Sequence, residues 1–364
     1  MDAVRRTLRS AEDLADAGMV PRERLPALRA VAARYAIAIT PAMAALIDPD
    51  DPADPIARQF LPSEAELQVA AGESADPIGD AAHSPVAGIV HRYPDRLLLK
   101  VTHCCAVYCR FCFRRETVGP GGDSILSPAA LDAAFAYIAG HPEVWEVILT
   151  GGDPLMLSPR RLGNVMDRLA AIEHVKIVRF HTRIPIVDPD RITTALVAAM
   201  RRPGKASYVA VHVNHPRELS PAARAACARL ADAGMPLLGQ TVLLSGVNDD
   251  QATLEALMRG LVEARVKPYY LHHGDFAPGT GHFRTGLEEG QTLVKQLRGR
   301  VSGLAQPTYV LDIPGGHGKV PVGPGYLAGD LDACAQVEDP WGATHRYPPI
   351  GVSSTAPRNP NATK

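Results

Sequence analysis

The sequence predicts an α/β fold in which six strand–helix units form an incomplete parallel barrel. Two observations lead to this prediction. Short runs of β-branched or aliphatic residues recur from about residue 97 onward, and amphipathic helical stretches separate them. Such alternation is typical of parallel βα units, whose functional side chains gather at the carboxyl ends of the strands.

The expected strands and helices follow one another in a regular order. The strand-like runs cover residues 97–102, 144–150, 175–181, 208–213, 237–243 and 267–272. The helical stretches between them include residues 127–139, 159–172, 220–233 and 250–264. One more strand-like run, residues 308–313, ends in a glycine-rich turn. Six units plus one extra strand suit an incomplete barrel better than a full eightfold barrel.

The N-terminal part is expected to be helical and rich in loops. Residues 7–17 and 22–35 have helical apolar spacing, and Ser63-Glu64-Ala65-Glu66 is typical of a helix start. Residues 48–55 are rich in proline and aspartate, which predicts a turn or linker. We expect three regions: an N-terminal helical region (1–88), a barrel core (89–305) and a C-terminal segment (306–364) whose tail is frayed from Ser353 onward.

Composition excludes several classes of protein. The 364 residues are 46% hydrophobic and 21% charged, values that are ordinary for a globular chain. A net charge of −1 argues against a protein that grips nucleic acid by its phosphates. The apolar stretch at residues 36–47 is too short and too interrupted to span a membrane. With neither a signal peptide nor a transit peptide recognisable at the N-terminus, we expect a soluble, cytoplasmic protein.

The cysteines are strongly clustered. Four of the six lie within nine residues, at Cys104, Cys105, Cys109 and Cys112. A secreted disulfide scaffold spreads its cysteines along a short chain, so this cluster indicates a metal or redox site in a reducing compartment. Cys227 and Cys334 are expected to be small buried hydrophobic residues.

Cys105, Cys109 and Cys112 form a CxxxCxxC triplet directly after the first predicted barrel strand. Thiolates select zinc, copper(I) or iron–sulfur clusters. A closed zinc site takes four ligands, whereas three ligands on one loop suit a [4Fe–4S] cluster with one iron open to another ligand. Cys104 is a weaker candidate, because adjacent cysteines rarely both point at one metal. A non-catalytic iron–sulfur or zinc-binding protein is the alternative at this point.

The triplet at the end of the first barrel strand resembles the radical S-adenosylmethionine superfamily. Further motifs narrow the resemblance to the lysine 2,3-aminomutase family, over about residues 35 to 327. These motifs are His91-Arg-Tyr-Pro-Asp-Arg96, Thr150-Gly-Gly-Asp-Pro154, His212-Val-Asn-His-Pro216, Gly239-Gln-Thr-Val-Leu-Leu-Ser-Gly-Val-Asn248, His282-Phe-Arg-Thr285 and Asp312-Ile-Pro-Gly-Gly-His-Gly-Lys319.

This resemblance implies a partial, TIM-like (β/α)6 barrel with an N-terminal helical region and a C-terminal segment that carries the cofactor lysine. It implies an isomerase that interconverts L-lysine and β-lysine, in which a 5′-deoxyadenosyl radical acts on the pyridoxal phosphate aldimine of the substrate. The implied cofactors are a [4Fe–4S] cluster, S-adenosyl-L-methionine and pyridoxal 5′-phosphate. An electron donor such as flavodoxin or ferredoxin, and a possible homo-oligomer, complete the expected partners.

Five residues match positions that bind S-adenosylmethionine in the family. Gly151, Gly152 and Asp153 resemble the segment that receives its methionyl amino group, and His212 and Gln240 match contacts from later strands. Taken alone, the first three residues fit an ordinary βα turn equally well. His212 alone would more often be a hydrogen-bonded core histidine.

Lys319 follows the flexible segment Pro314-Gly-Gly-His-Gly318, where a ligand can approach the backbone closely. An amine there can form a Schiff base with a carbonyl cofactor. The resemblance implies that Lys319 carries pyridoxal phosphate and that Arg96 binds its phosphate. An ordinary turn or a phosphate-cradling loop is the alternative, although the P-loop spacing is absent. His317 stands where the family usually has glycine, which leaves the local geometry open.

Three more residues match substrate contacts. The resemblance implies that Arg114 binds the α-carboxylate and that Asp275 and Asp312 hold the distant ammonium group. Long family members have a structural zinc site that this chain is expected to lack, since Asp250 replaces its first cysteine.

Two substrate alternatives stay open. A protein-lysine aminomutase acting on elongation factor P is suggested by Cys112-Phe-Arg-Arg115, which is closer to the short relatives. A glutamate aminomutase is disfavoured, because the γ-carboxylate would face Asp275 and Asp312.

Overall fold

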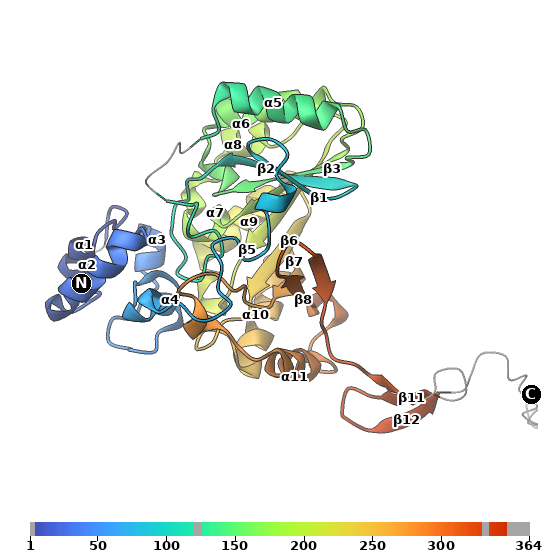
Figure 1. Cartoon of the computed structure of the whole chain (residues 1–364). Helices are drawn as coiled ribbons and strands as arrows, with labels where there is room; N and C mark the ends of the chain where they lie inside the picture. Colours follow the sequence, from blue (N-terminus) through green and yellow to red (C-terminus); the bar gives the residue numbers. More distant parts are fainter. Residues whose placement is uncertain (1–3, 120–124, 330–334, 348–364) are drawn as a thin grey trace, which may run out of the picture.

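The computed structural model describes residues 4–119, 125–329 and 335–347. A curved sheet forms its centre, with the N-terminal helices on one side and a small C-terminal sheet projecting from the other (Figure 1). Cys334 and the expected frayed tail from Ser353 onward lie outside the described residues.

The main sheet has nine strands in sequential order, and its inner seven run parallel. These are β2 (Arg96–Thr102), β3 (Glu146–Gly151), β4 (Ile177–Thr182), β5 (Ala206–His212), β6 (Leu237–Val242), β7 (Val266–His272) and β8 (Thr308–Ile313). The antiparallel strands β1 (Ile89–Tyr93) and β9 (Gly318–Pro321) form the two edges. The predicted six units plus one strand are confirmed, and β1 and β9 were not expected.

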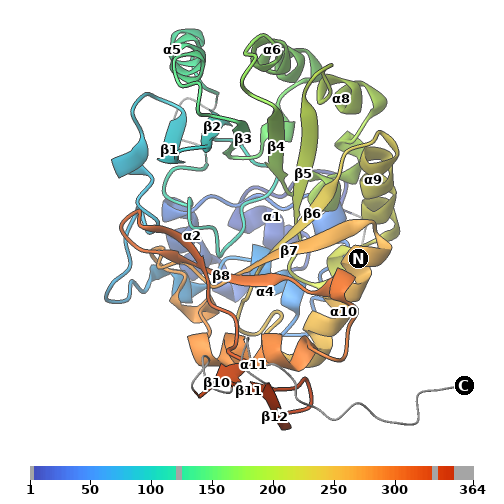
Figure 2. The same ribbon diagram turned by 90° about the vertical axis from the view of Figure 1, so that its right-hand side faces the viewer.

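Helices follow the outer face of this curved sheet (Figure 2). They are α5 (Pro128–Ala139), α6 (Pro159–Ala170), α8 (Thr194–Ala199), α9 (Pro221–Asp232), α10 (Gln251–Glu263) and α11 (Leu287–Leu297), with the short α7 (Ile184–Val187) after β4. Ser127, Ser158 and Ser220 each cap a helix whose first residue is proline. The serine oxygen binds a free backbone N–H and proline has none to satisfy, so the Ser-Pro pair fixes the start. Asp250 caps α10 in the same way.

The N-terminal region packs against the barrel rather than standing apart from it. Its helices are α1 (Ala11–Asp16), α2 (Leu25–Arg34), α3 (Pro41–Ala44) and α4 (Pro55–Phe60). The first begins later than predicted because Ser10 is its cap, and Asp54 ends the predicted turn by capping α4. One hydrophobic core runs without interruption from the N-terminal Leu8 to Tyr309 on β8.

A second, three-stranded antiparallel sheet was not foreseen. Strands β10 (Leu327–Ala328), β11 (Ala335–Glu338) and β12 (Thr344–Tyr347) form it beyond the barrel. An ion pair of 2.7 Å between Lys295 on α11 and Glu338 ties it to the main body.

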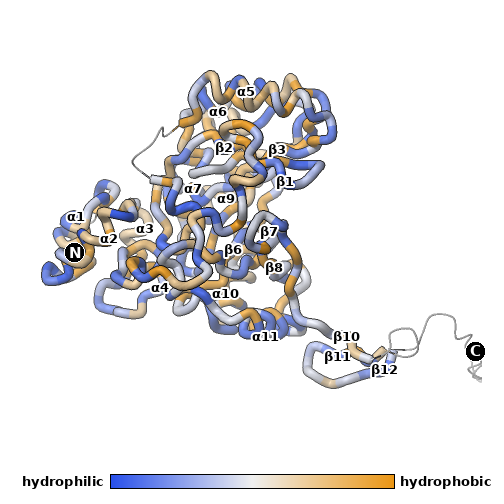
Figure 3. The backbone as a smooth tube through the Cα atoms, viewed as in Figure 1, coloured by the Kyte–Doolittle hydropathy of each residue, from blue (hydrophilic) through white to orange (hydrophobic). Residues whose placement is uncertain are grey.

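Hydrophobic and hydrophilic stretches alternate along the covering helices α5 and α6 (Figure 3). Within the described part of the chain, none of the helices combines the length and the apolar character needed to span a bilayer.

A buried carboxylate joins the N-terminal region to the loop that carries the cysteines. Glu66 is fully buried in a 3₁₀ turn, Glu64–Leu67, which Ser63 caps. Arg110 is 2% exposed and binds Glu66 through Nε at 3.0 Å and Nη2 at 2.6 Å, and Arg115 binds the same carboxylate. Two loop guanidiniums therefore share one acid from a segment more than forty residues earlier.

We expect Glu66→Gln to destabilise the fold by about 3–5 kcal/mol, because it leaves two buried cations without a full counter-charge. Glu64 lies on the same turn, but its side chain is 59% exposed in a loose 3.7 Å ion pair with Arg24. Glu64→Gln should therefore change stability by less than about 1 kcal/mol. Chemical denaturation of both variants measures the difference, and equal effects would contradict this assignment.

Candidate active site

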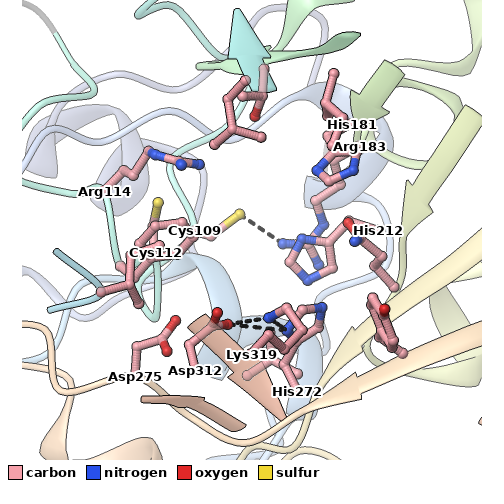
Figure 4. Close-up of a pocket in the computed structure, with 18 of the residues that line it drawn as sticks. Cys109, Cys112, Arg114, His181, Arg183, His212, His272, Asp275, Asp312 and Lys319 are labelled. Atoms are coloured by element: carbon pink, nitrogen blue, oxygen red, sulfur yellow. Dashed lines mark hydrogen bonds and ion pairs between the residues drawn. The ribbon is translucent and has the colours of Figure 1, made fainter. Parts of the chain in front are cut away.

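One cavity of about 780 Å³ extends through the barrel from the carboxyl ends of the strands to the start of β2 at Arg96, and every site residue expected from the sequence lines it. These are Arg96, Cys105, Cys109, Cys112, Arg114, Gly151, Gly152, Asp153, His212, Gln240, Asp275, Asp312 and Lys319. Several of them face each other across the cavity in Figure 4. Its size is ordinary for a site that takes a small molecule.

The three motif cysteines lie on the irregular loop after β2. Burial raises the pKa of the Cys105 thiol well above its usual range and that of Cys112 to about 11. Both thiols therefore stay protonated at neutral pH unless a metal compensates the charge of the thiolate. No three Cys, His, Asp or Glu side chains of the described residues converge on a single-ion site. In an iron–sulfur cluster, by contrast, each thiolate binds a different iron.

Gly151 and Gly152 let the cysteine loop lie directly on the end of β3. A Cβ at Gly151 would stand 2.4 Å from the Thr102 carbonyl oxygen, and one at Gly152 would stand 2.3 Å from that of Cys104. Gly151 also has a φ of +107°. The backbone of Cys104 is used in this contact, and Cys104 does not line the cavity. The two glycines are thus required for the packing of the cysteine loop.

The Asp153 carboxylate is engaged within the protein. It accepts hydrogen bonds from Thr182 Oγ1 at 2.7 Å, from the Arg183 N–H at 2.7 Å and from the Leu155 N–H at 3.0 Å. These bonds tie the end of β3 to the end of β4. Because the Asp153 carboxylate is already hydrogen-bonded within the protein, an amine that binds at this segment would contact other groups.

His212 and Gln240 are brought together by strand register. They are paired residues, His212 being the last residue of β5 and Gln240 lying within β6, and His212 Nε2 lies 3.0 Å from Asn214 Oδ1. Burial, followed by the charge of Arg183, lowers the pKa of His212 well below its usual value. A neutral imidazole and an amide suit contacts to an uncharged ring or hydroxyl group better than contacts to an ion.

Lys319 and Asp312 are directly opposed residues of the antiparallel pair β8–β9, so their side chains share the face that lines the cavity. Lys319 Nζ forms an ion pair with Asp312 and lies 3.2 Å from His272 Nδ1 (Figure 4). Although burial would raise it, the pKa of Asp312 is held below its usual range by His272 and Lys319. Lys319, which the sequence predicts to attach a cofactor, is thus paired with Asp312, which the sequence predicts to bind substrate.

The glycine-rich turn before Lys319 is fixed by close contacts with an earlier segment. A Cβ on Gly79 would stand 2.3 Å from the Gly316 nitrogen, and the Lys319 N–H donates to Tyr93 Oη at 2.7 Å. His317 is exposed and is not among the residues with positive φ, so it fits the turn without strain. Arg96 lies 3.9 Å over the Tyr93 ring and pairs with the exposed Asp95 at 2.7 Å.

Arg114 is paired across the cavity rim with Asp80, which the sequence did not single out. Its Nη2 lies 2.8 Å from Asp80 Oδ2, and Arg92 Nη2 lies 3.3 Å from Oδ1 of the same carboxylate. The Nε of Arg114 is buried without a hydrogen-bond partner among the described residues. One donor of this guanidinium is therefore available to an incoming acceptor.

Asp275 has a different environment from Asp312. Its carboxylate makes no hydrogen bond with another described side chain or backbone group, although it lines the cavity. Burial and the nearby Asp312 raise the pKa of Asp275 to about 7, while Lys319 and Arg114 oppose the shift. A buried acid that lacks a counter-ion is prepared to accept a cationic ligand.

Sequence reasoning missed three further charged or titratable residues of the site. His272 contacts Lys319, Asp80 contacts Arg114, and Arg183 donates from Nη1 to Cys109 Sγ at 2.7 Å. His272 and Arg183 stand at the carboxyl ends of β7 and β4, a position that the barrel rule marks as functional. Asp80 precedes the barrel and offered no such signal.

Known proteins share both the barrel and its C-terminal segment with this chain. Residues 99–257 match the radical SAM superfamily, and residues 294–333 match the lysine-2,3-aminomutase family. The L-lysine 2,3-aminomutase of Acetoanaerobium sticklandii is 43% identical over 291 residues, which cover 80% of this chain and 70% of that protein. The glutamate 2,3-aminomutase of Clostridioides difficile is 39% identical and covers 82% of this chain and 70% of its own length.

Among solved structures, a radical SAM methyltransferase from Sphaerobacter thermophilus matches with 21% identity and a TM-score of 0.43, covering 61% of this chain and 68% of that chain. Family membership rests on the sequence relatives, since their identity of about 40% extends over most of the chain. It implies an iron–sulfur cluster and S-adenosylmethionine as cofactors. The chain is a radical SAM aminomutase and belongs to the lysine 2,3-aminomutase family.

Proposed function

We propose that this enzyme interconverts L-lysine and β-lysine by moving the amino group between C2 and C3. The observation that carries the proposal is the unpaired Asp275 carboxyl beside Asp312, in the cavity that also contains Arg114 and Lys319. Free lysine has an ammonium group at one end and an α-carboxylate at the other, which match these acids and this guanidinium in charge.

Cys105, Cys109 and Cys112 are the residues that would hold a [4Fe–4S] cluster. The donor set is three thiols on one loop, and desolvation raises the pKa of two of them, so that their thiolates need a metal for charge compensation. Gly151, Gly152, His212 and Gln240 line the neighbouring wall and would bind S-adenosylmethionine. We assign the Asp153 carboxylate to fixing this wall, through Thr182 and Arg183.

Lys319 and Arg96 would hold pyridoxal phosphate. The Lys319 amine projects into the cavity from β9, and the turn before it is fixed by Gly79 and Tyr93. Arg96 lies over the Tyr93 ring, and its pairing with the exposed Asp95 is weak enough for a phosphate to replace. A lysine, a planar aromatic platform and an arginine suit the anchoring of a phosphorylated aldehyde.

When bound, these groups supply a 5′-deoxyadenosyl radical that removes hydrogen from C3 and a π-system that stabilises the migrating centre. The residues of this chain orient the substrate at its two ends, with Arg114 at the carboxylate and Asp275 with Asp312 at the ammonium. His272 Nδ1 lies beside the Lys319–Asp312 pair, 3.2 Å from the amine and 3.9 Å from the carboxylate, and can move a proton there. A glutamate side chain would place its carboxylate against two acids, which disfavours it.

The cluster assignment predicts that Cys105→Ala, Cys109→Ala and Cys112→Ala each abolish iron uptake and S-adenosylmethionine cleavage. Cys104→Ala should retain both, because Cys104 does not line the cavity and contributes backbone contacts to β3. Iron analysis and cleavage assays of anaerobically reconstituted protein measure these outcomes. Loss of iron in the Cys104 variant together with its retention in the Cys105 variant would reverse the assignment.

Lys319→Ala should leave no borohydride-trapped pyridoxyl adduct, since it removes the only amine that we place at the cofactor. Lys100→Ala provides the control, because this half-buried lysine of β2 does not line the cavity and should leave the adduct in place. Peptide mapping by mass spectrometry reads out the attachment site. An adduct at Lys100 or any other lysine argues against the proposed function of Lys319.

Asp275→Asn should reduce turnover of free lysine by about two orders of magnitude or more, because a buried ammonium loses a charged partner. The pKa of Asp275 is about 7 while Lys319 is a free ammonium and higher once that charge is removed, so kcat/KM for lysine should rise about tenfold or more from pH 6 upward as Asp275 ionises. The Asn variant should lack this rise, and glutamate should not be turned over.

Steady-state kinetics across this pH range, with β-lysine detected by chromatography, provide the measurement. If the reconstituted enzyme does not turn over free lysine but modifies a lysine of elongation factor P, the proposed free-lysine substrate is wrong and the protein is the substrate.

A further inference from the structure

Arg183 lies beneath the cysteine loop, immediately after β4. Its side chain is buried, and Nη1 donates a 2.7 Å hydrogen bond to Cys109 Sγ (Figure 4). Arg110 and Arg115 are nearer to the cysteines in sequence, but their guanidiniums bind Glu66 and backbone carbonyls. Among the arginines that the structure describes, Arg183 alone donates a hydrogen bond to a cysteine sulfur.

The Arg183 guanidinium is held in place independently of Cys109. Its Nη2 donates to Glu218 Oε2 and to Gln59 Oε1, both at 2.7 Å, and both partners are fully buried. Glu218 is fixed in turn by the backbone N–H groups of Asn214 at 3.1 Å and His215 at 2.9 Å. A donor anchored in this way keeps its position when the charge of its acceptor changes.

We propose that Arg183 is a positioning residue that raises the reduction potential of the cluster bound by the loop, through its charge-assisted hydrogen bond to the Cys109 sulfur. The inference rests on the cluster assignment proposed above. Reduction transfers one electron from a low-potential one-electron donor to the cluster, and no proton or leaving group moves. The added negative charge is shared with the ligand sulfurs, so a fixed cation at one of them stabilises the reduced state more than the oxidised state.

This arrangement has a direct functional consequence. A higher potential makes the cluster easier for the external donor to reduce, and it decreases the driving force for electron transfer onward to S-adenosylmethionine. Hydrogen bonds to charged groups are stronger than those between neutral groups, so loss of this one is measurable in a reduction equilibrium. The Glu218 carboxylate compensates the charge of the Arg183 guanidinium, which lowers the free-energy cost of burying that charge.

The test is a redox titration of reconstituted Arg183→Gln and Arg183→Lys proteins, followed by the electron paramagnetic resonance signal of the reduced cluster. At the wild-type midpoint, the ratio of reduced to oxidised cluster should fall about tenfold in the Gln variant, equivalent to ~59 mV for one electron. The Lys variant should fall between the two, because it retains the charge but loses the planar fork.

Arg191→Gln is the matched control. Arg191 is a partly buried arginine that binds the carbonyl oxygens of Leu155 at 2.7 Å and Met156 at 2.5 Å, and it contacts no described cysteine. The reduction potential of the cluster in the Arg191→Gln protein should equal that of the wild type. This variant separates the effect of a guanidinium at the sulfur from the general effect of removing an arginine near β3.

A wild-type potential in Arg183→Gln protein that holds its full iron complement overturns the inference. Weaker binding of S-adenosylmethionine at an unchanged potential also overturns it and assigns the guanidinium to a carboxylate of that ligand. If the Gln variant does not fold, the Lys variant decides, since a wild-type potential there is equally contrary. Wild-type protein that takes up no cluster at all defeats the proposed function, and this inference with it.

Discussion

The candidate site depends on how the Glu66 carboxylate holds Arg110 and Arg115. The loop from Cys104 to Arg115 contains no helix or strand, yet it must present three thiols to one cavity. A buried Arg–Glu–Arg arrangement contributes little net stability, since desolvation offsets most of the attraction. Its contribution is geometric, because Arg110 contacts both carboxylate oxygens and Arg115 adds a second guanidinium. The N-terminal region thereby becomes part of the site.

Most charges in the cavity are compensated by a protein partner before any ligand binds. Arg114 faces Asp80, Lys319 faces Asp312, and Arg183 faces Glu218. Each pairing lowers the cost of keeping a charge in a poorly solvated space. Asp275 has no such partner among the described residues, and its pKa is raised to about 7. A substrate with one carboxylate and two amino groups can exchange into such a set without leaving an uncompensated ion.

The order of strands and helices was predictable because local signals determine it. Parallel strands covered on both faces consist of aliphatic runs, and Ser-Pro pairs mark helix starts at residues 127, 158 and 220. The CxxxCxxC spacing and the lysine after the glycine-rich turn indicated residues that line one cavity. The sequence did not reveal which acid each cation faces, as with Asp80 and Arg114, because such pairs depend on distant segments meeting. The short edge strands β1 and β9 and the C-terminal sheet likewise depend on tertiary pairing rather than on periodicity.

The register of β8 and β9 connects the two ends of the proposed chemistry. Asp312 and Lys319 are opposed across an antiparallel pair, so the acid and the amine begin from adjacent positions on the same face of the ladder. While Lys319 is a free ammonium, it occupies Asp312 and competes with any other cation for that carboxylate. In the proposed function, attachment of a carbonyl cofactor to Lys319 would remove this competing ammonium from Asp312. The same acid then becomes available to a second ammonium, and Asp275 beside it becomes more costly to ionise until that cation arrives. In the proposed function, the placement of Lys319 opposite Asp312 would therefore make cofactor attachment and cation binding depend on each other.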